Sequence, residues 1–156
     1  SPVREFQSEA GVASATKCRF GILTGNPNPI AFAAARQSGY SFLNSLNTVM
    51  PNQDYDFGGV YNEVTGTFTA PPGASLAVVT ANGYITSETS SADFTWELWL
   101  NGAEYAGFRH SGSLRGFGPG TFGLMPVSPG DTLQVRTDNL AGFTRTGEIY
   151  TAVEFY

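Results

Sequence analysis

The 156-residue sequence is short of basic residues, histidine and cysteine, and each shortage excludes a class of protein. Eight basic residues are set against thirteen acidic ones, which gives a net charge of −5. This charge argues against nucleic-acid binding, which needs a basic surface for the phosphates. Cys18 is the only cysteine, so the chain cannot form the internal disulfides of the disulfide-framed secreted class. We interpret Cys18 as a small buried apolar side chain.

Long apolar runs are also missing. No run approaches the about eighteen apolar residues of a membrane-spanning helix. No basic start followed by an apolar stretch marks a signal peptide. Charged residues make up 13% of the chain, about half of the usual share. A polar surface must therefore be built from Ser, Thr, Asn and Gly.

The residues needed for hydrolysis and for zinc binding are scarce. His110 is the only histidine, and the adjoining Ser111 would face the opposite side of a strand. The GxSxG elbow of serine hydrolases is absent, as are the CxxC, HxH and HExxH patterns of zinc sites. We therefore expect a protein that is not an enzyme and holds no zinc.

Acidic residues leave two further hypotheses open. Glu97 lies between Trp96 and Trp99, a combination that suits a sugar site, whereas a packing role for both tryptophans is the alternative. Asp93, Glu104, Glu148 and Glu154 could pair with Glu97 in a glycosidase, but nothing in the sequence selects a pair. Calcium binding by Asp54 and Asp56 is a weaker alternative to a solvated loop, because the acidic spacing of an EF-hand is missing.

Glycine and proline are plentiful. Nineteen glycines and nine prolines are spread along the chain and divide it into short segments. Apolar runs recur between them and predict about nine or ten short strands. The predicted strands are residues 30–35, 55–61, 66–70, 75–85, 93–100, 104–110, 121–127, 132–137 and 148–156. Residues 116–120 lack the lysine of a phosphate loop and are predicted to be a bent or flexible loop. Residues 41–50 have partial helical spacing, which their Asn, Ser and Thr content opposes.

Alternation supports the strand assignments. Phe94, Trp96 and Leu98 fall on one face of their segment. In residues 148–156 both faces carry aromatic side chains, which suggests that a second subunit covers the face turned away from the core. Asn101-Gly102 joins two alternating runs and predicts a hairpin turn. Pro129-Gly130-Asp131 predicts another tight turn.

Thr65–Pro71 reads TGTFTAP and follows Phe57, Tyr61 and Asn62. This order resembles the globular heads of complement C1q-like proteins, and three further segments are similar to those heads. Residues 31–34 are similar to their AFxA first strand. Residues 128–133 resemble their GDxV/L turn, and residues 150–156 resemble their aromatic last strand. The residues at Ala74, Leu76, Val78 and Ala152-Val153 differ from those usual in the family, and no collagen-like repeat precedes the head.

The resemblance implies an all-β, ten-stranded antiparallel jelly-roll sandwich of the C1q/tumour-necrosis-factor type, which packs as a homotrimer. Its departures suggest a distant member of bacterial or viral origin. Residues 1–29 are then an N-terminal arm or neck, and residues 30–156 are the jelly-roll domain. Some heads of this family bind calcium; we expect no other cofactor.

The leading hypothesis is a non-enzymatic, trimeric binding head of an extracellular, cell-surface or virion-surface protein that recognises a protein or glycan. The alternative is a structural virion domain, a capsid decoration or fibre tip, whose arm anchors it to a capsid or stalk protein; a glycan-active enzyme comes last. Neither nucleic acid nor a membrane is expected as a partner. From their expected placement in loops, we predict that six residues contact the ligand: Tyr105, Phe108, Arg109, His110, Arg115 and Phe117.

Overall fold

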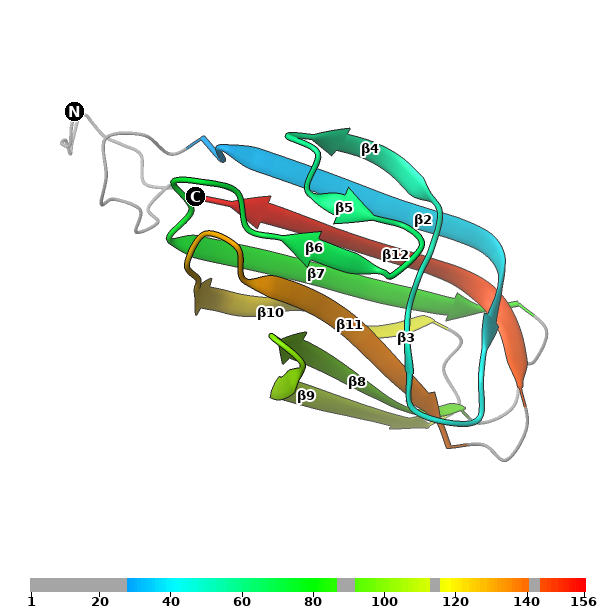
Figure 1. Cartoon of the computed structure of the whole chain (residues 1–156). Coiled ribbons are helices and arrows are strands. Elements are labelled where there is room, and N and C mark those ends of the chain that lie inside the picture. Colours follow the sequence, from blue (N-terminus) through cyan, green and yellow to red (C-terminus); the bar gives the residue numbers. More distant parts are fainter. Residues whose placement is uncertain (1–27, 87–91, 113–115, 141–143) are drawn as a thin grey trace, which may run out of the picture.

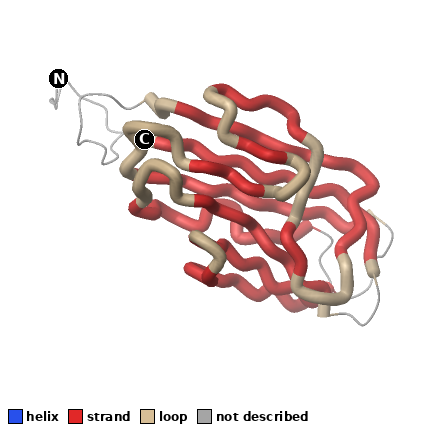
Figure 2. The backbone as a smooth tube through the Cα atoms, viewed as in Figure 1, coloured by secondary structure: helices blue, strands red, loops and turns tan. Residues whose placement is uncertain are grey.

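The chain folds into two antiparallel β-sheets packed face to face (Figure 1). A computed structural model describes residues 28–86, 92–112, 116–140 and 144–156, and within these ranges the chain contains strands and loops but no helix (Figure 2). The strands are β2 (Ala31–Phe42), β3 (Asn47–Thr48), β4 (Gln53–Phe57), β5 (Tyr61–Asn62), β6 (Thr67–Thr69), β7 (Leu76–Ile85), β8 (Ala92–Leu100), β9 (Ala103–Gly112), β10 (Gly116–Pro126), β11 (Thr132–Asn139) and β12 (Arg145–Phe155). The expectation of an all-β sandwich is confirmed.

One sheet contains five strands in the order β10-β7-β12-β2-β4. The other contains six strands, in the order β5-β6-β11-β8-β9 with β3 also paired to β11. Strands far apart in the sequence are neighbours in both sheets, so the sandwich closes only when the C-terminal strand β12 pairs with β2 and β7. The long strand β2 pairs with β12 from Ala31 opposite Phe155 to Phe42 opposite Arg145.

The core lies between the sheets and follows the alternation of the strands. In β8 the buried side chains are Phe94, Trp96 and Leu98, as the sequence predicts. In β12 the residues Ile149 and Val153 are buried, and their even-numbered neighbours point to the other side of the sheet. The largest fully buried side chains are Trp96, Phe42, Phe68, Phe94 and Phe155.

Turns follow the predicted chemistry at two places. Asn101 and Gly102 both have positive φ, 50° and 83°, as a tight hairpin between β8 and β9 requires. Gly130 has a φ of 91°, and the Asp131 carboxylate accepts a hydrogen bond of 2.8 Å from the Ser128 backbone N–H. Asn101 Nδ2 donates to the same carboxylate at 2.9 Å, so the two turns support each other.

Three strand assignments were predicted wrongly. The first strand does not end at residue 35 but continues as β2 to Phe42. Residues 55–61 are not one strand: Gly58 and Gly59 adopt positive φ, and the chain passes there from β4 in one sheet to β5 in the other. Residues 116–120 are not a loop but the start of β10, which pairs with β7 across register shifts. In residues 41–50 no helix forms, because Phe42 ends β2 in the core and Asn47 Nδ2 bonds Ser45 instead.

The start and the end of the described chain lie at the same end of the sandwich (Figure 1). The Ile30 backbone N–H donates to the Phe155 carbonyl at 2.8 Å. The C-terminal ends of β2, β7, β9 and β11 lie at the opposite end, which we call the distal end (Figure 1). Among the described residues no helix is long and apolar enough to cross a membrane. Cys18 and most of the predicted arm lie outside these residues.

Candidate functional site

Aromatic side chains gather on the outer surface of the five-stranded sheet. Alternation turns one set of side chains in β2, β12 and β7 toward the core and the other set away from it. The register places the outward residues of neighbouring strands side by side. We call this surface the aromatic face, and its large rings are Phe32, Tyr55, Phe57, Tyr84 and Tyr150.

The aromatic face is packed internally and still exposed to solvent. The rings of Phe32 and Phe57 stack with centroids 5.2 Å apart, and Tyr55 meets Phe32 edge to face at 5.7 Å. The exposed fraction is nevertheless 59% for Phe57, 47% for Tyr55 and 44% for Tyr84. Apolar surface of this extent on one sheet is typical of an interaction site rather than of a free surface.

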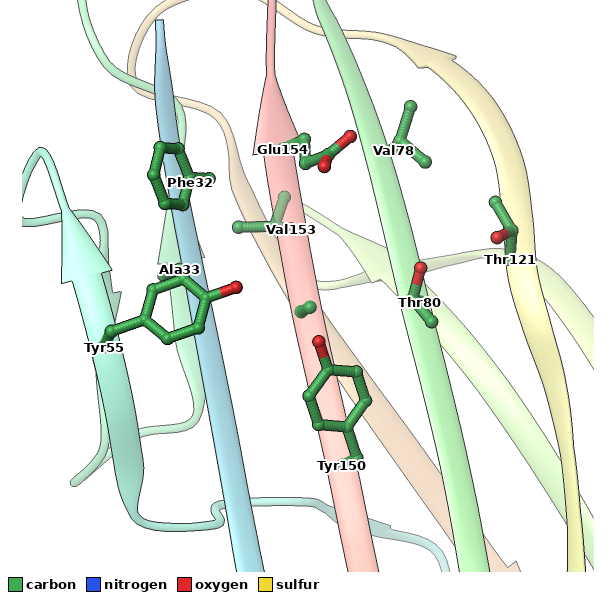
Figure 3. Close-up of a pocket in the computed structure, with 10 residues that line it drawn as sticks. Phe32, Ala33, Tyr55, Val78, Thr80, Thr121, Tyr150, Val153 and Glu154 are labelled. Carbon is green, nitrogen blue, oxygen red and sulfur yellow. The ribbon is translucent and has the colours of Figure 1, made fainter. Parts of the chain in front are cut away.

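A hollow of about 230 Å³ crosses the middle of the aromatic face. Its floor is a row of small side chains, because Ala152, Thr80 and Thr121 line the hollow and are neighbours in the register of β12, β7 and β10. Figure 3 shows the rings of Phe32 and Tyr55 to one side of the hollow, Tyr150 on the central strand β12, and Thr80 and Thr121 toward the other side. The hollow can therefore receive a bulky apolar group beside aromatic rings.

The charges near the hollow are few, and each carries a hydrogen bond. Glu154 accepts a hydrogen bond of 2.9 Å from the Tyr156 hydroxyl. Arg36 forms an ion pair of 2.7 Å with Asp54, which raises the pKa of the guanidinium by hydrogen bonding and charge. Burial raises the pKa of Tyr150, whose ring lies 6.0 Å from the Arg36 Cζ. The phenol is thus neutral at physiological pH, as a group at an apolar contact should be.

Exposed leucines mark the distal end. Leu43 and Leu46 lie in the β2–β3 connection and Leu140 follows β11, with exposed fractions of 44%, 41% and 40%. Asn139 joins the two segments, since its backbone N–H donates to the Leu43 carbonyl at 3.2 Å. The Leu140 N–H donates to the Asp93 carbonyl at 2.8 Å. These backbone hydrogen bonds hold the β2–β3 connection and the end of β11 together, so the exposed leucines lie at one apolar edge.

The nominated contact residues lie on two neighbouring sheet edges. Tyr105 and Phe108 are on the edge strand β9, with exposed fractions of 49% and 40%. Arg109 forms a two-pronged ion pair with Asp93 at 3.0 and 2.8 Å, which raises the pKa of the guanidinium. His110 is paired in β9 with Phe94, and Phe117 in β10 with Gly83, which fixes their backbone positions. Arg115 lies outside the described residues.

These residues do not form one cluster along the strands. Tyr105 is near the turn that joins β8 to β9, whereas Arg109 and His110 approach the distal end of β9. The structure thus separates Tyr105 from the distal group. Ser111 pairs with Asp93 while His110 pairs with Phe94, so the two backbone positions alternate along the strand as the sequence argument required.

The two tryptophans have different roles. Trp96 is fully buried and packs in the core, whereas Trp99 and Glu97 are outward and only partly buried. Trp99 Nε1 donates to Glu97 Oε1 at 2.7 Å. The packing hypothesis is therefore confirmed for Trp96 alone.

Asp54 and Asp56 lie in strand β4 and not in the solvated loop that the sequence suggested, and both already have partners. Asp54 binds Arg36, and the Asp56 carboxylate accepts hydrogen bonds from the Val60 and Tyr61 backbone N–H groups at 2.8 and 2.9 Å. The described part of the chain contains no group of three side chains able to hold a metal ion. The geometry gives calcium binding by Asp54 and Asp56 no support.

Sequence reasoning missed most of the aromatic face. It noted two-sided aromatic character only in the last strand, which contributes Tyr150. The alternation of Phe32 with small residues in the segment Ala31–Ala35 was a further signal. Tyr55 and Phe57 could not be assigned because residues 55–61 were taken as one strand.

Comparison with known proteins gives the fold but no close relative. No protein-family model matches the chain. No curated protein matches it in sequence. Among solved structures, the PRD1 vertex protein P5 matches with a TM-score of 0.60 and 14% identity, over 82% of this chain and 97% of that chain. Murine APRIL matches with a TM-score of 0.51 and 11% identity, over 79% of this chain and 98% of that chain.

The globular domain of zebrafish complement 1qA protein also matches, with a TM-score of 0.47 and 14% identity over 81% of this chain and 95% of that chain. The identities are too low to transfer an activity, so the comparisons establish architecture. Together with the two-sheet topology described above, the matches to the vertex protein P5 and to APRIL identify the chain as an all-β sandwich of the C1q/TNF-like fold.

Proposed function

We propose that this chain is a non-enzymatic head domain that forms a homotrimer through its aromatic face and binds its ligand at the surface of a virion. The observation that carries the proposal is the exposure of stacked aromatic rings on a whole sheet face. Exposed rings of this kind lose little conformational entropy on association and bring a large apolar area to an interface.

A second copy of the chain is the best occupant of the aromatic face. Its apolar walls and small-residue floor suit the insertion of a ring such as Tyr84 from a neighbouring copy. Arg36 is paired with Asp54, whereas the Glu154 carboxylate accepts a hydrogen bond from the Tyr156 hydroxyl and keeps its charge, so little charge opposes self-association. The C1q resemblance, which implies a homotrimer, agrees with this assignment.

The virion location is supported by the match to the PRD1 vertex protein P5 over 97% of that chain. Residues 1–29 would then serve as the arm that joins the head to a capsid or stalk protein. An extracellular or cell-surface head is the alternative, which the APRIL match supports. The genes beside the coding sequence distinguish the two, because capsid or tail genes there indicate a virion protein.

The ligand-binding region is assigned to the distal end. Leu43, Leu46 and Leu140 offer an apolar contact there, and the Arg109–Asp93 pair lies next to it. This end is opposite the start of the head, so a tether at residue 28 leaves it accessible. A protein ligand fits exposed leucines better than a sugar does.

Light scattering tests the assembly directly. The homotrimer should have about three times the chain mass of 16.6 kDa. A clean monomer at micromolar concentration contradicts the proposal. Leu46→Asp should keep the trimer mass and abolish attachment of the labelled head to host cells, whereas Val64→Asp, at an 81% exposed residue between β5 and β6, should change neither.

A further inference from the structure

The outer surface of the six-stranded sheet carries a row of planar polar side chains. We call it the polar face. Outward residues of β8 and β11 are neighbours there: Trp99 lies opposite Gln134, and Glu97 lies opposite Arg136. Each is partly buried, so the groups cover one another while remaining accessible from outside. This face belongs to the opposite side of the sandwich from the aromatic face.

Hydrogen bonds and stacking hold these groups in fixed positions. The Arg136 guanidinium lies over the Trp99 indole, with Cζ 3.8 Å from the ring centroid. Arg136 Nη2 donates to Gln134 Oε1 at 3.2 Å, and Gln134 Nε2 donates to Thr67 Oγ1 at 3.2 Å. Glu97 holds the indole N–H at 2.7 Å. A ligand would meet side chains that have already lost their rotational freedom, which reduces the entropy cost of binding.

A bare position adjoins this row. Gly107 pairs with Glu97 across β8 and β9 and has no side chain to cover it. A Cβ placed at Gly107 would lie 3.1 Å from Glu104 Oε2 and 4.0 Å from Glu97 Cγ. The Glu104 carboxylate therefore lies over Gly107 itself, next to the Glu97 side chain. The two carboxylates can accept hydrogen bonds from adjacent hydroxyl groups of one ligand.

We propose that the polar face is a binding site for a neutral saccharide, centred on Trp99 and Glu97. Its parts are those that sugars require: an aromatic ring, carboxylate acceptors, and the guanidinium and amide donors of Arg136 and Gln134. A guanidinium carries five N–H donors. The Arg136 Nε is buried, so a ligand would meet the terminal nitrogens of this group.

The charge balance selects a neutral sugar. Outward side chains on β8, β9 and β11 include the carboxylates of Asp93, Glu97, Glu104 and Asp138, against the guanidiniums of Arg109 and Arg136. This excess of negative charge repels uronates and sialic acids. The inference rests on the proposed trimer only for its valency: three outward polar faces would strengthen binding to a multivalent glycan surface without new contacts.

Tryptophan fluorescence can test the proposed site without an added label. Trp96 is fully buried and Trp99 is outward, and these are the only two tryptophans. Titration with free mannose-, galactose- and glucose-containing oligosaccharides should therefore change the fluorescence of Trp99 with saturation. Glu97→Gln should weaken binding about tenfold, because a charged acceptor is replaced by a neutral one. Trp99→Ala should abolish binding, and Val64→Ser should leave it unchanged.

The outcomes separate this inference from the proposed function. No fluorescence response to any neutral sugar at millimolar concentration, a response only to acidic sugars, or binding that is unaffected by Glu97→Gln overturns the saccharide site. The trimer mass is unaffected by any of these results. Conversely, a monomer that still binds the free sugar with the same affinity contradicts the trimer and leaves the saccharide site standing.

Discussion

The aromatic face makes a quantitative prediction at Phe57. Its exposed fraction is 59%, which for a phenylalanine corresponds to about 120 Å² of surface. Burial of that surface in a trimer contributes about 3 kcal/mol per chain at 25 cal/mol per Å², and alanine retains about 1 kcal/mol of it. Phe57→Ala therefore removes about 2 kcal/mol per chain and about 6 kcal/mol per trimer.

This loss should be visible as dissociation. It raises the trimer dissociation constant by about four powers of ten. Because the midpoint concentration of a monomer–trimer equilibrium follows the square root of that constant, the midpoint rises about 100-fold. Sedimentation equilibrium over a wide concentration range measures the midpoint, with Val64→Ala as the control at an exposed apolar residue outside the aromatic face. An unchanged midpoint for Phe57→Ala would refute burial of this ring between copies.

Three further predictions concern the stability of the fold. Trp96→Ala should lower the free energy of unfolding by about 3–5 kcal/mol because it leaves a cavity in the core. Trp99→Ala should lower it by only about 1 kcal/mol, mainly through the lost contact with Arg136. Equal losses in urea denaturation would contradict the assignment of Trp96 to the core and of Trp99 to the outer surface. Gly147→Ala should destabilise the fold by about 3 kcal/mol, since the added Cβ would collide with the backbone carbonyl of Tyr84 and push β7 away from β12. An unchanged melting temperature would contradict this, because it would show that the two strands can move apart without cost. The Asn101 and Ser128 hydrogen bonds lower the pKa of Asp131 below its ordinary 3.8, so the carboxylate stabilises the fold above that pH and the contribution disappears as the pH falls through the folded-state value. The difference in unfolding free energy between the protein and Asp131→Asn should therefore shrink on acidification below pH 3.8, and a constant difference would contradict the role of the charge.

The alternation of side chains predicted the fold class because burial acts on every second residue of a strand. Phe94, Trp96 and Leu98 are buried as expected, and Phe68 lies in the core between Thr67 and Thr69. Asn101-Gly102 forms its turn because both residues tolerate positive φ. These are local properties, and a single sequence contains them.

The errors concern contacts between distant segments. Nothing within residues 55–61 shows that the chain changes sheets at Gly58-Gly59; that depends on β2 pairing with β4 and on β6 pairing with β5. The start of β10 needs β7 as a partner. The aromatic face combines β4, β2, β12 and β7, and local alternation cannot show which strands lie side by side. Likewise, Glu97 and Trp99 were recognised as a pair, but Arg136 and Gln134 join them only through the pairing of β8 with β11.

The pairing of β2 with β12 has a mechanical consequence. A head held at the start of β2 and pulled by a ligand at the distal end is loaded along the length of this strand. The β2–β12 hydrogen bonds run across that direction, so they share the force and must break together rather than one after another. The strand that begins the domain is thus loaded in shear, the arrangement in which an antiparallel pair best resists extension under tension.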